Sequence, residues 1–121
     1  MLVAPEEGSA IKIEQIRDVV SQTAYRPFEG RSRVVIVDDA DLMGEDAQNA
    51  LLKTLEEPPP RNVFVLVTSR PDTLLDTIRS RCCLLRFAPL APHDIAAGLM
   101  SAHGFDEHEA RATAALANGS F

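Results

Sequence analysis

The sequence predicts an α/β fold with a parallel sheet, followed by a short, purely helical region. Two runs of β-branched and apolar residues, Val34–Val37 and Val63–Val67, are typical of strands buried on both faces. Segments with helical spacing precede the first run and separate it from the second. This alternation of helix and strand indicates right-handed crossovers between parallel strands.

The residues before the first strand are expected to form a loop and then a helix. Met1–Ala10 contains proline, glycine and serine, which favour a loop. Apolar residues then recur at three- and four-residue steps, so they share one helix face. These residues are Ile13, Ile16, Val19 and Val20. The segment Arg-Pro-Phe-Glu-Gly at 26–30 is expected to end this helix and turn the chain.

A second helix is expected between the two strands, over Glu45–Leu55. Its two opening acidic residues suit the positive end of the helix dipole, and the three prolines at 58–60 end it. After the second strand, Pro71–Ser80 predicts a short helix or two turns. The apolar run Leu84–Phe87 predicts a third strand.

The character of the sequence changes near Pro89. Two alanine-rich segments, His93–His103 and Glu107–Asn118, are expected to be helices, and no strand pattern follows them. The sequence therefore predicts a strand-containing domain over residues 1–88 and a helical domain that opens over residues 89–121.

Composition excludes several classes of protein. The formal net charge is −6, whereas a free-standing nucleic-acid-binding protein usually presents a basic surface. The two cysteines, Cys82 and Cys83, are adjacent, which disfavours both a disulfide between them and a structural zinc site. No apolar run approaches the length of a membrane span. These features favour a reduced, cytoplasmic protein without a membrane partner.

Two carboxylates, Asp38 and Asp39, follow the first predicted strand directly. Ligands of open parallel sheets bind at the carboxyl ends of the strands, and a carboxylate there can hold Mg²⁺. In P-loop ATPases this element is called Walker B, and a second carboxylate orients the attacking water. Asp39 is one methylene shorter than the usual glutamate at that position. Two solvated acidic residues after a strand would give the same pattern.

Two further side chains are candidates for contact with a phosphate. Thr68 follows the second predicted strand, where a hydroxyl can sense a γ-phosphate or simply cap the next turn. Arg81 stands in Ser80-Arg81-Cys82, between a short helix and a predicted strand. An arginine at a domain edge can stabilise phosphoryl charge in a neighbouring subunit, although a surface ion pair is the commoner role.

The phosphate-binding pattern G-x-x-x-x-G-K-[ST] is absent from the 121 residues. The two lysines, Lys12 and Lys53, do not follow glycine. We therefore expect no bound cofactor in this chain and no ATPase activity of its own.

A receiver-like signalling module also carries two carboxylates after a strand. A receiver needs a phospho-accepting aspartate after a later strand, whereas Val63–Val67 is followed by Thr68 and Ser69. A receiver's acidic pair also follows its first strand, whereas here a complete helix precedes the pair. The receiver interpretation is therefore the weakest of the alternatives.

Taken together, three motifs resemble one family, the AAA+ clamp loaders of bacterial DNA polymerase III. The segment 48–59, Gln-Asn-Ala-Leu-Leu-Lys-Thr-Leu-Glu-Glu-Pro-Pro, is similar to the helix after Walker B in that family. Ser80-Arg81-Cys82 matches its SRC motif, and Ile11–Arg17 resembles the segment that leads into the preceding helix. The intervals between the motifs also agree, and the resemblance extends from about Ile11 to the end.

The resemblance implies a fold and a role for each candidate residue. Residues 1–88 would be a partial RecA-like (AAA+) nucleotide-binding domain, and residues 89–121 the start of a helical lid. Asp38 and Asp39 would be the Walker B pair, with Asp38 holding Mg²⁺ only when nucleotide is bound, and Thr68 would be sensor 1. Arg81 would be an arginine finger for ATP held by a neighbouring subunit.

The resemblance also implies the subunit type and its partners. Ser69–Cys82 is most similar to the delta prime type of subunit, which donates an arginine without hydrolysing ATP. A fragment of the gamma or tau motor ATPase is the alternative, because the Walker B and sensor 1 positions survive. Expected partners are the gamma or tau and delta subunits, and through them the sliding clamp and primed DNA. The P-loop and the collar domain of the family lie outside these residues, so we also expect self-association through an uncovered sheet face.

Overall fold

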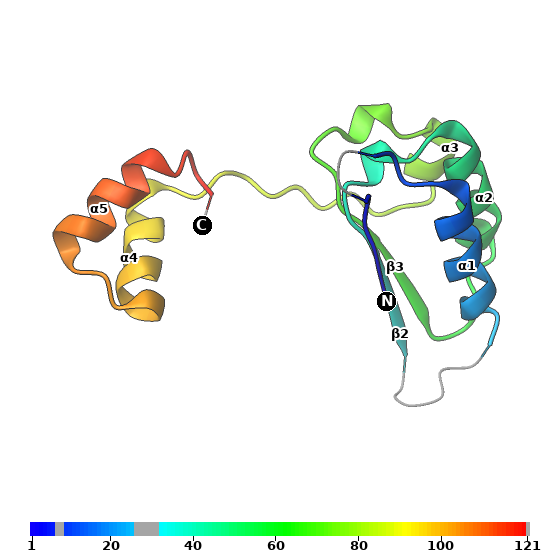
Figure 1. Ribbon diagram of the computed structural model, residues 1–121, viewed down its shortest axis with the longest axis horizontal. Coiled ribbons are helices and arrows are strands. Elements are labelled where there is room, and N and C mark those ends of the chain that lie inside the picture. Colours follow the sequence, from blue (N-terminus) through cyan, green and yellow to red (C-terminus); the bar gives the residue numbers. More distant parts are fainter. Residues whose placement is uncertain (7–8, 26–31, 121) are drawn as a thin grey trace. The chain divides into compact units, whose positions relative to one another are not determined.

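The computed structural model describes residues 1–6, 9–25 and 32–120, which form two compact units. The first unit spans Met1–Leu84 and the second Leu85–Phe121 (Figure 1). The turn predicted at 26–30 lies outside the described residues. No helix in the described segments is long and apolar enough to cross a membrane.

The first unit is built on a three-stranded sheet in which all strands are parallel. The strands are β1 (Leu2–Val3), β2 (Arg33–Val37) and β3 (Asn62–Leu66), in that order across the sheet. Helix α1 (Ile13–Thr23) connects β1 to β2, and α2 (Glu45–Glu56) connects β2 to β3. The predicted α/β class with a parallel sheet is therefore confirmed.

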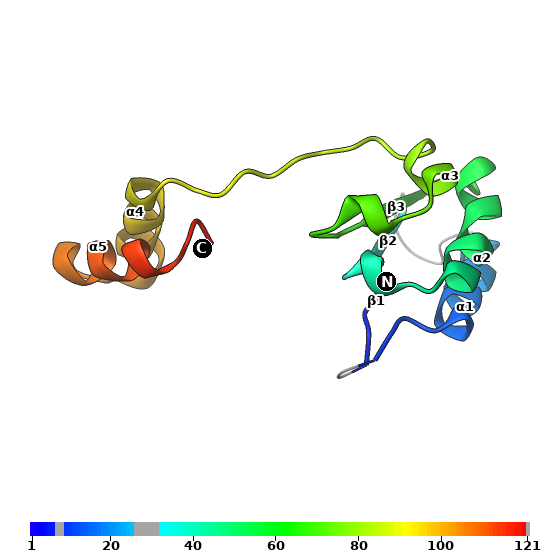
Figure 2. The same cartoon turned by 90° about the horizontal axis from the view of Figure 1, so that it is seen from above.

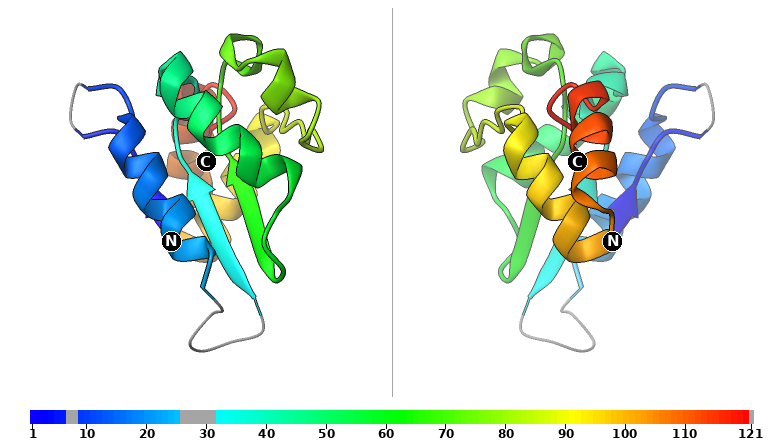
Figure 3. Two further views of the ribbon diagram at one scale, coloured as in Figure 1. Left: turned by 90° about the vertical axis from the view of Figure 1, so that its right-hand side faces the viewer. Right: turned by 90° about the vertical axis from the view of Figure 1, so that its left-hand side faces the viewer.

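Both connecting helices cover the same face of the sheet (Figure 3, left). Two successive right-handed crossovers that step in one direction across a sheet must place their helices on the same side. Figure 2 shows α1 and α2 side by side against that face. The core of this unit lies between the helices and the sheet, and it includes the buried side chains of Ile11, Ile16, Val35, Val37 and Leu51.

The prediction that the strands are buried on both faces was wrong. Along β2 the side chains alternate: Val35 and Val37 are buried, whereas Val34 and Ile36 are exposed. Val63 and Val65 of β3 are exposed as well. The reason is that α1 and α2 protect only one face of this sheet. Self-association through the other face stays a prediction.

Two local predictions of strand and loop were also wrong. Met1–Ala10 was expected to be a loop, but Leu2–Val3 forms β1, held to β2 where Asp38 N–H donates to Val3 O over 2.8 Å. A two-residue strand leaves no pattern in a sequence. Leu84–Phe87 was expected to be a strand, yet these residues form neither strand nor helix. An apolar run becomes a strand only where a sheet edge accepts its hydrogen bonds.

After β3 the chain makes two short helical turns, η2 (Pro71–Thr73) and α3 (Asp76–Arg79), as the sequence predicted for that segment. The second unit is a pair of helices, α4 (Pro92–His103) and α5 (Glu107–Leu116), again as expected. Asp106 caps α5 by accepting the Glu109 N–H over 2.8 Å. The assignment of the two units to a partial nucleotide-binding domain and a lid stays a prediction.

Candidate functional site

The acidic pair and Thr68 lie at the same edge of the sheet. Strands β2 and β3 run parallel and pair Val37 with Leu66. Asp38 and Asp39 come directly after β2, and Thr68 lies two residues after the end of β3. The segments that follow the two strands are joined by a hydrogen bond in which Ala40 N–H donates to Val67 O over 2.8 Å. The structure therefore brings together three of the four predicted site residues.

The acidic pair begins a tight turn. Asp39 has a φ of 48°, a left-handed conformation that aspartate tolerates better than most residues. Its N–H donates to Asp38 Oδ1 over 3.1 Å, and its carbonyl accepts Leu42 N–H over 2.8 Å. The turn continues into the 3₁₀ helix η1 (Ala40–Leu42). Asp38 is half-buried by this arrangement and Asp39 stays exposed.

A third carboxylate, Asp41, is the most strongly bound side chain at this edge. The Thr68 hydroxyl donates to Asp41 Oδ1 over 2.7 Å. Arg70 donates to Asp41 Oδ2 twice, from Nε over 2.9 Å and from Nη2 over 2.7 Å. The Asp41 side chain is only 5% exposed, whereas that of Arg70 is 61% exposed. These contacts tie the segment after β2 to the segment after β3.

These hydrogen bonds fix both the charge of Asp41 and the orientation of Thr68. The Thr68 hydroxyl, and after it the Arg70 guanidinium, lower the pKa of Asp41 below its ordinary value of 3.8. Asp41 is therefore ionised at neutral pH. The Thr68 oxygen also accepts the Arg70 N–H over 2.9 Å. A hydroxyl has one proton to donate, and that of Thr68 is committed to Asp41.

Asp41 and Arg70 were not predicted as site residues. Asp41 lies three residues after Asp38, and Arg70 two residues after Thr68. Because the segments that leave neighbouring parallel strands meet at one edge, opposite charges at these offsets were a usable signal. The sequence pattern drew attention to the adjacent acidic pair and left the third aspartate unexamined.

Among the residues given, Asp38 could act as a metal ligand, but the sequence pattern of a phosphate-binding loop is not among them. Asp38 Oδ1 accepts the Asp39 N–H, and a carboxylate can still give its other oxygen to Mg²⁺. Mg²⁺ is usually bound by one or two carboxylates together with substrate phosphates and water. No group of three or more His, Cys, Asp and Glu side chains in the described ranges could hold a metal ion. A metal at Asp38 would therefore depend on nucleotide phosphates.

Arg81 lies away from the acidic pair. It follows α3, and its Nη2 donates to Glu56 Oε1 over 2.6 Å. Glu56 is the last residue of α2, a helix of 12 residues that is about 18 Å long at 1.5 Å per residue. The acidic pair precedes the first turn of the same helix. The structure therefore does not bring Arg81 to Asp38, Asp39 and Thr68.

Residues 1–91 of the chain match the protein family described as "DNA polymerase III, delta subunit", which is most of its 121 residues. The chain belongs to the clamp-loader subunit family of DNA polymerase III. This membership confirms the resemblance noted in the sequence and sets aside the receiver-like alternative.

Several subunit types of the family are similar to this chain. It is 44% identical over 88 residues to DNA polymerase III subunit delta' of Escherichia coli (72% of this chain, 26% of that protein). It is 39% identical over 117 residues to subunit delta' of Bacillus subtilis (97% and 35%). It is 34% identical over 120 residues to subunit gamma of Buchnera aphidicola (95% and 33%).

A solved structure of a DNA polymerase III gamma subunit-related protein has the same fold. The crystal structure of a DNA polymerase III gamma subunit-related protein from Thermotoga maritima superposes with a TM-score of 0.69 at 30% sequence identity. The match covers 98% of this chain and 43% of that protein. The chain thus has the parallel α/β core of the AAA+ type. The chain spans about a third or less of the length of the three curated relatives.

A buried amide joins the start of α2 to the segment before α3. Gln48, on the first turn of α2, is 4% exposed. Its Nε2 donates to Met43 O over 3.1 Å, and its Oε1 accepts the Leu75 N–H over 2.7 Å. Gln48 therefore fixes the segment before α3, and with it the approach to Arg81, against the start of α2. The sequence singled out Gln48 only as part of a motif.

Proposed function

We propose that this chain is part of a delta-prime-type clamp-loader subunit, which supports ATP-driven loading of the sliding clamp onto primed DNA. In this role Arg81 is an arginine finger for ATP and Mg²⁺ held by an adjacent gamma or tau subunit. One observation carries the proposal: Arg81 lies at the opposite end of α2 from the acidic pair. It therefore cannot contact a nucleotide bound beside the acidic pair of its own chain.

The position of Arg81 suits a residue that acts on a neighbour. Its side chain is 34% exposed, so it can be reached from outside the unit. A guanidinium is always charged and presents donors in a planar fork that matches phosphate oxygens. An arginine supplied by another subunit stabilises the charge that develops during phosphoryl transfer.

The chain's own nucleotide edge is poorly equipped for hydrolysis. The Thr68 hydroxyl is committed to Asp41, and Asp39 stands where a longer glutamate would orient water. These features support a subunit that assists hydrolysis without performing it.

The proposed partners follow from this role. Within the assembly the chain contacts gamma or tau through the Arg81 edge, and it reaches delta, the sliding clamp and primed DNA through the complex. The formal net charge of −6 suits a protein whose main partners are other subunits.

The test is the Arg81→Ala substitution in the full-length protein, followed by assembly of the loader and measurement of ATP turnover. We expect turnover at the adjacent motor site to fall by about 10³-fold or more, with assembly intact by gel filtration. The matched control is Arg79→Ala, which removes an exposed arginine that pairs with Asp72 and Asp76. Normal turnover in an intact Arg81→Ala loader would refute the finger role.

A fragment of the gamma or tau motor ATPase is the second candidate. It is favoured by the 34% identity to a gamma subunit over 95% of this chain and by the acidic pair at the strand end. The gene sequence upstream of Met1 separates the two candidates. A G-x-x-x-x-G-K-[ST] loop followed by four closely spaced cysteines would favour the motor.

A further inference from the structure

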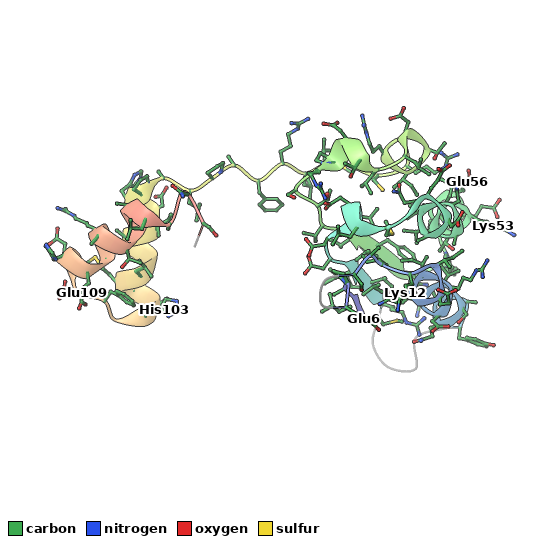
Figure 4. The ribbon with its side chains drawn as sticks, turned by 45° about the horizontal axis from the view of Figure 1, so that its top comes forward. Glu6, Lys12, Lys53, Glu56, His103 and Glu109 are labelled. Carbon is green, nitrogen blue, oxygen red and sulfur yellow. The ribbon has the colours of Figure 1, made fainter. Side chains whose placement is uncertain are left out.

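Arg81 is held by three contacts that come from two elements. Its Nη1 donates to Thr77 O in α3 over 2.8 Å and to the Ser80 hydroxyl over 3.3 Å. Its Nη2 donates to Glu56 Oε1, at the end of α2, over 2.6 Å. Glu56 follows Lys53 by three residues on that helix (Figure 4). A flexible arginine side chain is thereby fixed in one orientation.

These contacts leave part of the guanidinium unused. Of its five N–H groups, two on Nη1 and one on Nη2 face the three acceptors. The Nε–H and the second Nη2–H have no partner among the residues that the structure describes. In Arg70 of the same unit, Nε and Nη2 together bind a carboxylate. The corresponding atoms of Arg81 therefore retain donors for an incoming phosphate.

We propose that Glu56 is a positioning residue for Arg81, which orients the guanidinium so that its free N–H groups meet phosphate oxygens of a nucleotide in the adjacent subunit. This inference rests on the finger role proposed above. Glu56 itself contacts no nucleotide and acts only through Arg81. Orientation matters because a displacement of about 1 Å in a reacting or stabilising group can lower a rate by about 100-fold.

The opposite role for Glu56 would be to hold Arg81 away from the nucleotide. A restraining carboxylate would have to release its charge-assisted bond before the finger could act, so removing it would raise turnover. In this chain Glu56 engages one of the two Nη2 hydrogens, and the backbone acceptor Thr77 O holds the other end of the guanidinium. The finger can therefore act with Glu56 still bound, and a positioning role fits the contacts better.

The test uses four variants of the full-length protein in the assembled loader: Glu56→Ala, Glu56→Gln, Arg81→Ala and the double variant Glu56→Ala/Arg81→Ala. We expect Glu56→Ala to lower kcat at the adjacent site by about ten- to a hundredfold, with little change in KM for ATP. Glu56→Gln keeps an acceptor oxygen and should restore most of the rate. The double variant should be no slower than Arg81→Ala, because Glu56 acts only through Arg81.

The matched control is Glu57→Ala, which removes the same charge from the next residue, also exposed. It should leave kcat unchanged. Faster turnover in Glu56→Ala would show a restraining role and overturn the inference. Unchanged turnover in Glu56→Ala, while Arg81→Ala is slow, would overturn the inference and leave the finger role standing. If Arg81→Ala itself has full activity, the finger role and the inference fail together.

Discussion

Thr68 donates its hydroxyl proton to Asp41 Oδ1 over 2.7 Å, across the gap between the segments that leave β2 and β3. The same hydroxyl oxygen accepts the Arg70 N–H over 2.9 Å. A threonine that was predicted to sense a phosphate is thus bound within its own chain. A phosphate would have to displace Asp41, an ionised carboxylate that two Arg70 donors also hold in place.

The first prediction concerns the contribution of Asp41 to stability. Asp41→Ala leaves the half-buried Thr68 hydroxyl without its acceptor, and we expect a loss of about 1–3 kcal/mol in the free energy of unfolding. The exposed Arg70 ion pair adds little to this figure. Urea denaturation measures the change. Asp72→Ala is the control, since its side chain is 93% exposed and should cost less than about 0.5 kcal/mol. Equal losses in the two variants would disprove the role given to Asp41.

The second prediction concerns pH. Because the pKa of Asp41 is lowered in the folded state, the unfolded chain binds its proton at higher pH than the folded chain does. The stabilisation from Asp41 is therefore complete above its unfolded pKa of 3.8 and declines as pH falls through the lower folded value. Urea denaturation between pH 6 and pH 3, at about unit steps, measures the free energy of unfolding of wild type and Asp41→Asn. The wild-type value should approach that of the variant only at the acidic end. A difference in the free energy of unfolding that is constant over this pH range would contradict the lowered pKa of Asp41.

The third prediction compares two glycines of the helical unit, both with positive φ. Gly119 has a φ of +84°, and a Cβ added there would lie 2.3 Å from Pro89 Cβ. Its carbonyl also accepts the Leu90 N–H over 2.9 Å. Gly104 has a φ of +70°, but no atom lies within 4 Å of an added Cβ. Gly104→Ala should cost only the left-handed penalty of about 1–2 kcal/mol.

Gly119→Ala should cost more than Gly104→Ala, because it adds a steric clash to the same backbone penalty. Hydrogen exchange of the α4 and α5 amides measures this locally, and each 1.4 kcal/mol speeds exchange by about tenfold. Similar exchange rates in the two variants would show that the Gly119–Pro89 contact does not hold the helical pair.

The periodic and β-branched segments were predictable because their signals are local. The helix at Glu45–Leu55 and the strand at Val34–Val37 were found almost to the residue, as α2 and β2. β1 was not predictable, because its two residues become a strand only when β2 lies beside them. Leu84–Phe87 failed for the opposite reason: its local pattern favours a strand, but a strand forms only where a sheet edge accepts its hydrogen bonds, and these residues are not in a strand.

The residues of the candidate site also fall into a predictable group and an unpredictable group. Asp38, Asp39 and Thr68 were found because each follows a recognisable strand, and the structure places them at one sheet edge. Asp41 and Arg70 were missed because the adjacent acidic pair was the more conspicuous pattern, and because their contact joins residues 29 positions apart. The partner of Arg81 was missed for the same reason, since Glu56 is 25 positions away. Contacts over such separations have no periodic signature in a single sequence.

The central claim is that this chain acts on a nucleotide held by another subunit, and one comparison tests it most directly. The measurement is ATP turnover of the assembled loader carrying either Arg81→Ala or Asp38→Asn in this protein. We predict that Arg81→Ala lowers turnover at the adjacent site by about 10³-fold or more, whereas Asp38→Asn leaves the rate within about twofold of wild type. Loss of turnover in Asp38→Asn with full activity in Arg81→Ala would contradict the account and identify a motor subunit.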